Sequence, residues 1–223
     1  MWPSSATIYI AAIGEDQEWD EVLGDYNDTI NSWDRFVHRL QFAYGIDMTS
    51  LKADYEGETE QYYYNTARWQ IIEPAVLVGE AQPVYSIDLK QASFKDAEGI
   101  SDSEFSLMHS LLKKNSDGTI SRVKDFLSIK GFALWFTIDF HGGSQHSTMS
   151  TGPENGYTHW GQYACYLHEP LKVAATQEFS GSFGMTRKKH NPRMYNLNIK
   201  VFSMSATDES KKTVLVDRTY DLP

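Results

Sequence analysis

The sequence has a single cysteine, Cys165, among its 223 residues, so no disulfide can form within the chain. This thiol lies in an alternating strand-like run without a neighbouring base or cation in sequence, which argues against a nucleophile and fits a reducing compartment. No run approaches the ~18 apolar residues of a membrane-spanning helix. The N-terminus also lacks the basic and apolar segments of a signal peptide. We therefore expect a cytoplasmic or nuclear protein with no membrane partner.

Motifs for binding nucleotides, phosphate and metals are missing as well. The sequence contains no G-x-G-x-x-G after a strand, no phosphate-binding loop, no C-x-x-C and no H-E-x-x-H. It also lacks the alternation of strands and helices that builds a nucleotide-binding parallel sheet. His141 and His146 flank a glycine-rich turn, but two histidines without a third ligand nearby are more often a polar turn. We expect no cofactor-binding residues and no metal in this chain.

Positive charge is scarce. The chain carries 30 acidic and 20 basic side chains, a formal net charge of −10, and has no lysine or arginine before Arg35. This balance repels nucleic-acid backbones and attracts basic partners, although solubility alone also explains it. The basic run Arg187–Arg193 is interpreted as a solvated turn. We therefore expect no nucleic-acid partner.

Short strand-like runs are abundant. Aromatic residues make up 13% of the chain, which favours sheet over helix. In Gly131–Phe140, every second residue from Phe132 onward is apolar, the period of a half-buried strand. Such runs with turns between them predict a mainly β fold, an antiparallel barrel or sandwich, as one domain over residues 1–223. The predicted strands are 7–13, 75–78, 84–89, 131–140, 147–151, 162–168, 171–174, 178–185, 194–204 and 213–221, with extended segments at 62–64 and 68–72.

Helical spacing follows the first predicted strand. An acidic segment begins at Glu15, and Asn27 or Asp28 is a candidate cap for a second helix that Gly45 would end. The region, at about residues 15–45, either packs on the chain's own sheet or protrudes as an arm whose apolar stripe needs another subunit. The apolar positions at helical spacing are Trp19, Val22, Leu23, Tyr26, Ile30, Trp33, Phe36, Val37, Leu40 and Tyr44.

The loop Gly152–Trp160 holds the most distinctive chemistry. Glycine and proline residues are followed by Thr158, His159 and Trp160, that is, by a hydroxyl, an imidazole and an indole in a row. Loops mounted on a rigid sheet often carry function. Chemistry alone favours a plain strand connection, in which Trp160 packs in the core and His159 bonds nearby backbone.

Beyond its individual residues, this loop resembles part of a known family. Met149–Pro153 followed by Tyr157–Trp160 resembles the C-terminal half of the class I protein arginine methyltransferases, where a Ser-Thr-x-Pro segment leads into a Thr-His-Trp loop. Phe132–Phe136 and Leu167–Val173 look most like the nuclear, asymmetric-dimethylating members.

The resemblance extends toward the N-terminus. Ala6–Ile13 is similar to the strand that opens the family's β-barrel, and Gly45–Leu51 to the stretch after its dimerisation arm. The matches keep the family's order from residue 6 to about residue 201, and this ordered set is far more specific than the Thr-His-Trp tripeptide alone.

The resemblance implies a substrate-binding β-barrel whose helical region is the dimerisation arm. Family members transfer methyl from S-adenosylmethionine to arginine guanidinium nitrogens, and they bind the cofactor and the arginine in a separate domain that this chain lacks. Glu15, Glu18 and Glu21 match no part of that domain's glutamate loop. Met1–Pro3 resembles the junction between the two domains, so the chain is interpreted as an isolated barrel half, either a fragment of a longer protein or a domain whose cofactor partner was lost. The implied partners are arginine-rich protein substrates, the missing domain, and a second copy or a paralogue.

The resemblance also assigns residue roles. His159 would play a supporting catalytic part from the barrel side, orienting a carboxylate of the cofactor domain or helping to move a proton. Trp160 would wall the arginine channel, and Thr158 would fix the loop through its backbone, so all three are predicted substrate-binding residues. The predicted dimerisation residues are Trp19, Leu23, Ile30, Trp33, Phe36, Val37 and Leu40.

Two features depart from the family pattern. Gly161 stands where the family often has lysine, which predicts a more mobile loop. Residues 111–127 look like an insertion and have no assigned role.

Three hypotheses follow for function. The first is the substrate-binding and dimerisation half of an active methyltransferase, inactive by itself. The second is a prozyme-like scaffold that binds and regulates a catalytic paralogue through the arm. The third, an unrelated β-sandwich binding module, leaves the ordered matches unexplained. A nucleotide-binding sheet and a two-glutamate loop upstream of Met1 would favour the first over the second.

Overall fold

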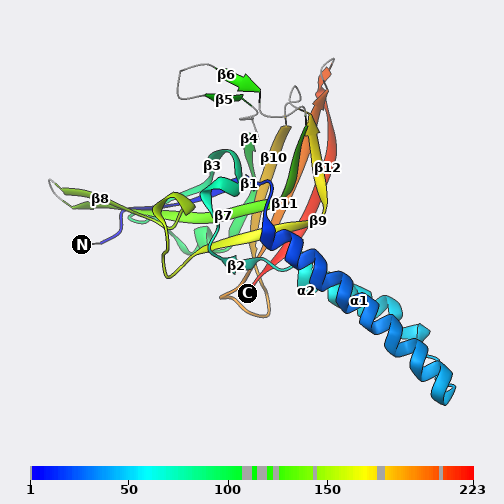
Figure 1. The fold of residues 1–223 in the computed structure, drawn as a ribbon. Helices are drawn as coiled ribbons and strands as arrows, with labels where there is room; N and C mark the ends of the chain where they lie inside the picture. Colours follow the sequence, from blue (N-terminus) through cyan, green and yellow to red (C-terminus); the bar gives the residue numbers. More distant parts are fainter. Residues whose placement is uncertain are drawn as a thin grey trace.

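The computed structural model describes residues 2–106, 112–114, 120–122, 126–142, 145–174, 179–205 and 208–223. Two β-sheets cross each other, and two helices project from one side of them (Figure 1). Within these residues, no helix has both the length and the apolar character to cross a membrane. The predicted mainly β fold with a helical arm after the first strand is confirmed.

The larger sheet has six strands in the order β2-β9-β7-β1-β3, with β8 paired to β7. Its strand pairs are all antiparallel. Register shifts between β1 and β3, and between β7 and β9, allow these long strands to bend and remain paired. For this reason β9 spans two runs that were predicted as separate strands. The strands are β1 (Ser5–Ile13), β2 (Arg68–Gln70), β3 (Leu77–Asp88), β7 (Phe126–Gly142), β8 (Gln145–Ser150) and β9 (Gln162–Ala174).

The smaller sheet has four strands in the order β12-β11-β10-β4, also antiparallel. They are β4 (Gly99–Ser106), β10 (Phe179–Arg187), β11 (Tyr195–Ser205) and β12 (Asp208–Leu222). A separate pair, β5 (Leu112–Lys114) and β6 (Ile120–Arg122), lies in the predicted insertion. Residues 111, 115–119 and 123–125 of that insertion lie outside the described residues.

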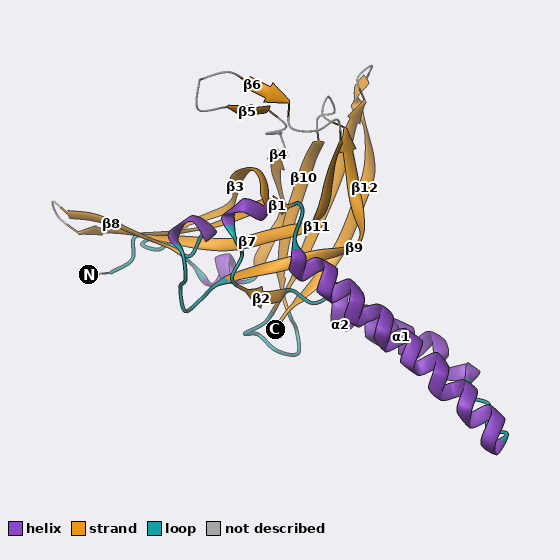
Figure 2. Cartoon of the chain, viewed as in Figure 1, coloured by secondary structure: helices purple, strands orange, loops and turns teal. Residues whose placement is uncertain are grey.

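The larger sheet is covered on both faces. Ile10 of β1 and Phe132 of β7 face the smaller sheet, where they pack with Phe183 and Ile199. The opposite face packs against the base of the helical arm, through a second cluster that includes Ala11, Ile13, Trp19, Tyr64 and Tyr166. This explains why β1 ends in four consecutive buried apolar residues. The two main sheets pack face to face through the first of these clusters and, in the described residues, do not close into a single ring (Figure 2).

The first arm helix is continuous. Helix α1 (Gln17–Tyr44) begins after Asp16, whose carboxylate accepts a hydrogen bond from the Glu18 amide at 3.2 Å, and ends at Gly45, where φ is +67°. The predicted break at Asn27 or Asp28 is therefore wrong. Both residues are exposed on the helix surface, where their lower helix propensity costs only a few tenths of a kcal/mol.

A second arm helix was missed. After the short turn η1 (Thr49–Leu51), helix α2 (Lys52–Tyr64) runs back along α1. The prediction that residues 62–64 are extended is wrong, because Tyr63 packs edge-on against Tyr26 of α1, with ring centres 5.9 Å apart. Tyr55 of α2 likewise stacks on Trp33 at 4.3 Å. The arm thus comprises both helices and extends to residue 64, beyond the predicted limit of about 45.

Candidate functional site

The loop that carries the Thr-His-Trp sequence connects β8 to β9 and is held at both ends. At its start, Thr151 bonds both backbone groups of Phe136: its hydroxyl accepts from the amide at 3.1 Å, and its own amide donates to the carbonyl at 3.0 Å. At its end, the buried amide of Gln162 donates to the Thr151 carbonyl at 2.7 Å and accepts from the Ile72 amide at 2.8 Å. These contacts, together with the turn η4 (Pro153–Asn155), fix the loop on the edge of the sheet.

The tip of the loop presents its polar and aromatic groups outward. The Thr158 hydroxyl accepts a hydrogen bond from the Gly161 amide at 3.2 Å, which confirms the predicted backbone bond. The His159 side chain is exposed. Trp160 is 53% exposed and meets Phe136 edge-on at 6.3 Å, so it lies on the surface and not in the core. An imidazole and an indole therefore stand side by side on a fixed loop.

Trp69 of β2 locks this tip from the neighbouring strand. Its indole N–H donates to the Trp160 carbonyl at 2.6 Å. Gly161 has a φ of +53°, and a Cβ there would lie 2.7 Å from the Trp69 indole nitrogen and 2.9 Å from the Gln70 carbonyl. A residue with a side chain would be both strained and obstructed at this position. The glycine thus serves close packing, which argues against the predicted gain in mobility.

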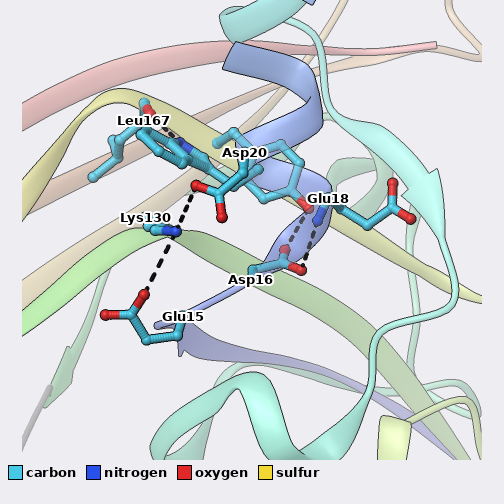
Figure 3. Close-up of polar contacts among 8 residues, drawn as sticks. Glu15, Asp16, Glu18, Asp20, Lys130 and Leu167 are labelled. Atoms are coloured by element: carbon cyan, nitrogen blue, oxygen red, sulfur yellow. Dashed lines mark hydrogen bonds and ion pairs between the residues drawn. The ribbon is translucent and has the colours of Figure 1, made fainter. Parts of the chain in front are cut away.

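The base of the arm is tied to the sheet by a buried polar cluster (Figure 3). The Tyr166 hydroxyl donates to the Asp16 carboxylate at 2.6 Å and also meets the Gln70 side chain at 2.9 Å. Burial, reinforced by the hydrogen bond to Asp16, raises the pKa of Tyr166 well above its usual value. The Trp19 indole N–H donates to the Leu167 carbonyl at 2.7 Å. The first turn of α1 is therefore fixed directly to strand β9.

Lys130 of β7 completes this arm-base cluster. Its ammonium lies 3.0 Å from the Asp20 carboxylate, 3.7 Å from that of Glu15 and 4.6 Å from the centre of the Trp19 ring. The lysine is 7% exposed, whereas both carboxylates reach solvent. A buried cation is thus held by two surface acids and an aromatic face. The acidic segment that was predicted to begin the arm therefore has a structural use in anchoring it.

The predicted dimerisation residues fall into two groups. Trp19 is buried in the arm base, and Leu23 packs against the same cluster, so both belong to the chain's own interior. Ile30, Trp33, Val37 and Leu40 are half-buried on the free length of α1, and Phe36 is exposed. Beyond them, the arm tip exposes Phe42 (88%) and Tyr44 (74%), two residues that were not included in the predicted set.

The structure also places the two histidines and the cysteine that were considered in the sequence. The rings of His141 and His146 stack at 4.4 Å across the β7–β8 hairpin. Within the described ranges, no group of three or more histidine, cysteine, aspartate or glutamate side chains is arranged to hold a metal ion. Burial raises the pKa of the Cys165 thiol, which keeps it protonated and unreactive.

Known proteins with the same features were found by sequence and by fold. The model of the arginine methyltransferase oligomerization subdomain matches residues 4–206. Protein arginine N-methyltransferase PRMT10 of Oryza sativa subsp. japonica is 29% identical over 203 residues, covering 88% of this chain and 50% of that protein. Protein arginine N-methyltransferase 1 of Caenorhabditis elegans is 30% identical over 204 residues, covering 89% and 46%. The chain thus spans about half the length of the curated relatives it matches.

Solved structures share the fold. The uniquely open structure of Arabidopsis thaliana protein arginine methyltransferase 10 superposes with a TM-score of 0.82 at 24% identity, covering 99% of this chain and 60% of that one. The Trypanosoma brucei PRMT1 enzyme–prozyme heterotetrameric complex with AdoHcy gives a TM-score of 0.66 at 17% identity, covering 100% and 57%. Together with the subdomain match over most of its length, this shows that the chain belongs to the protein arginine N-methyltransferase family, as its C-terminal half.

Proposed function

We propose that this chain is the substrate-binding and dimerisation half of an enzyme that transfers methyl from S-adenosylmethionine to guanidinium nitrogens of protein arginines. The observation that carries this proposal is the fixed loop that presents an exposed imidazole, His159, beside the half-exposed Trp160. The loop is clamped by Thr151, Gln162 and Trp69, so the imidazole is mounted on a rigid support. Pre-organised groups of this kind are what positioning and proton transfer require.

His159 would act on the reacting guanidinium from the barrel side. A neutral imidazole accepts a proton or a hydrogen bond, and an imidazolium donates to a carboxylate. Among the described residues, no hydrogen bond or ion pair engages its side chain, and its ring centre lies 6.2 Å from that of Trp160. Its nitrogens are therefore available to a carboxylate of the cofactor domain or to the substrate. The Trp160 face would form one wall of the channel through which the arginine enters.

The cofactor would bind in the part of the enzyme outside this chain. Nucleotide cofactors sit in crevices at the carboxyl ends of parallel strands, whereas the paired strands described in both main sheets here are antiparallel. The residues of this half thus do not fit S-adenosylmethionine. Their part is to bind and orient the substrate and to join subunits.

The arm would carry the association with a second copy or a paralogue. Its tip places Phe36, Phe42 and Tyr44 in water, an arrangement that costs free energy unless a partner covers them. The net charge of −10 suits arginine-rich substrates in the cytoplasm or nucleus.

The test is turnover by the complete protein with His159→Ala. Losing one orienting or acid–base group typically lowers the rate ~10²–10⁴-fold, so we expect kcat for an arginine peptide to fall within that range while the unfolding midpoint stays unchanged. His190→Ala is the matched control, since that histidine is exposed on the turn between β10 and β11. A kcat for His159→Ala equal to that of the control would show that His159 is not catalytic.

A further inference from the structure

We infer that Trp69 and Trp160 form an aromatic ledge that binds the guanidinium of a second arginine in the substrate, next to the arginine that reacts. This inference rests on the proposed function of the same loop and adds a determinant of specificity to it. Trp69 is a feature of this chain that the sequence motifs did not indicate. It reaches the loop from β2, a strand about 90 residues earlier in the chain.

The ledge is exposed and rigid. Trp69 is 50% exposed and Trp160 53% exposed, although large indoles are usually well buried. The hydrogen bond from the Trp69 indole to the Trp160 carbonyl fixes one residue relative to the other at 2.6 Å. The Trp69 ring also fills the space beside Gly161 that a Cβ would need. Two large aromatic side chains are thus held on the loop and the neighbouring strand, each with about half of its surface exposed.

Among the described residues, no lysine or arginine of the chain lies over the Trp69 or Trp160 ring. The cations that lie over aromatic rings there are Arg68 over Tyr62 and Tyr63, Lys130 over Trp19, and Lys212 over Phe202. Arg68 is next to Trp69 in sequence, but successive side chains of a strand point to opposite faces. The indole faces at the loop remain open to a cation from elsewhere.

The surroundings favour a guanidinium over other occupants. Arginine stacks on aromatic faces through both its charge and its planar group, and tryptophan is the strongest aromatic partner. Glu154 is exposed in the same loop, and Glu73 is exposed four residues after Trp69. The chain as a whole carries a net charge of −10. Acidic and aromatic groups together attract a basic planar side chain.

The distance between the His159 and Trp160 rings indicates how many residues separate the two arginines in the substrate. The centres of the His159 and Trp160 rings are 6.2 Å apart. An extended peptide rises about 3.3 Å per residue, so side chains two residues apart lie about 7 Å apart on the same face. A peptide with one arginine at His159 would therefore place an arginine two positions away over Trp160.

The test measures peptide affinity by fluorescence anisotropy with the complete protein. One labelled peptide has two arginines separated by a single glycine, and a second peptide has lysine in place of one of them. We expect Trp69→Ala to raise the Kd of the two-arginine peptide about two- to thirty-fold, and that of the lysine peptide less. Trp69→Phe keeps an aromatic face and should retain much of the preference for arginine. Phe94→Ala, at an aromatic ring that is 93% exposed in the short turn η3 (Phe94–Ala97), is the control and should change neither Kd.

Equal changes for both peptides, or none, would overturn the inference and reduce Trp69 to a structural residue. If Trp69→Ala does not fold, the wild-type protein still decides, through peptides whose arginines are separated by none, one, two or three glycines. We expect the lowest Kd with one intervening residue, and a Kd that is independent of spacing would contradict the inference. Formation of methylarginine from a single-arginine peptide, with no gain from the second arginine, would overturn the ledge and leave the proposed function standing.

Discussion

Two tyrosines at the base of the arm provide a matched pair of substitutions. Tyr166 and Tyr64 are both 1% exposed and belong to the same apolar cluster. The Tyr166 hydroxyl donates to the Asp16 carboxylate at 2.6 Å, whereas the Tyr64 hydroxyl is buried without a hydrogen-bond partner among the described residues. Replacing each with phenylalanine removes the same atom from nearly the same environment, so the difference reports the hydrogen bonds of the Tyr166 hydroxyl, to Asp16 and to Gln70.

We expect opposite outcomes for the two variants. A hydrogen bond to a charged group contributes about 1.5–3 kcal/mol, and Asp16 also caps α1, so Tyr166→Phe should lower the free energy of unfolding by about that amount. Tyr64→Phe removes an unsatisfied buried hydroxyl, so it should be neutral or stabilising by up to about 1 kcal/mol. Urea denaturation of both variants under the same conditions, with unchanged m-values, measures the difference. Equal free energies of unfolding for the two variants would refute the role of the Asp16–Tyr166 bond.

The pH dependence gives a second readout of the same pair. Burial raises the pKa of Tyr166 above its unfolded value of about 10, and raises that of Tyr64 to about 12. Above pH ~10 the unfolded tyrosines lose protons that the folded protein retains, so the stability from these groups is present below that pH and is lost as pH rises. Tyr166→Phe should therefore show a smaller loss of stability between pH 9 and pH 11, roughly the window around that unfolded value.

Three further predictions concern the arm and the cofactor. Lys130→Met should lower the free energy of unfolding by about 1–2 kcal/mol, because it removes the cation over Trp19 and its ion pairs with exposed acids; a change no larger than that of the exposed-site control Lys172→Met would contradict this. Trp33→Ala with Phe36→Ala should weaken a dimer of the complete protein, since each side chain gains about 1.5–3 kcal/mol when fully buried, and sedimentation that shows an undiminished dimer would place these residues in the arm's own interior. The 223-residue chain alone should neither bind S-adenosylmethionine nor methylate peptides, and calorimetric binding in the micromolar range would disprove this.

Apolar runs and their periodicity in the sequence predicted the two central strands of the larger sheet. The alternation from Phe132 to Phe140 lies within β7, and the run ending at Ile13 is β1. Helix α2 escaped prediction because its tyrosines favour sheet by propensity, and only their packing on Trp33 and Tyr26 makes them helical. In that segment tertiary contacts outweigh local preference.

The sequence predicted the part of the candidate site that is contiguous in the chain, but not the contacts between residues far apart in sequence. The Thr-His-Trp tripeptide marked the loop, and the backbone bond of Thr158 is confirmed. Trp69 was missed because its contact with Trp160 joins residues 91 positions apart, and no local pattern encodes such a pairing. The Asp16–Tyr166 bond, across 150 positions, was missed for the same reason. Gly161 was predicted to make the loop more mobile, although Trp69 occupies the space that a side chain at this position would need.

The most direct test of the central claim is mass spectrometry of an arginine peptide after incubation with the complete protein and S-adenosylmethionine. We expect methylarginine in the peptide, and a strongly reduced yield with His159→Ala. A correctly folded complete protein that forms no methylarginine, but raises the activity of a paralogue when mixed with it, would contradict the claim and favour a regulatory scaffold.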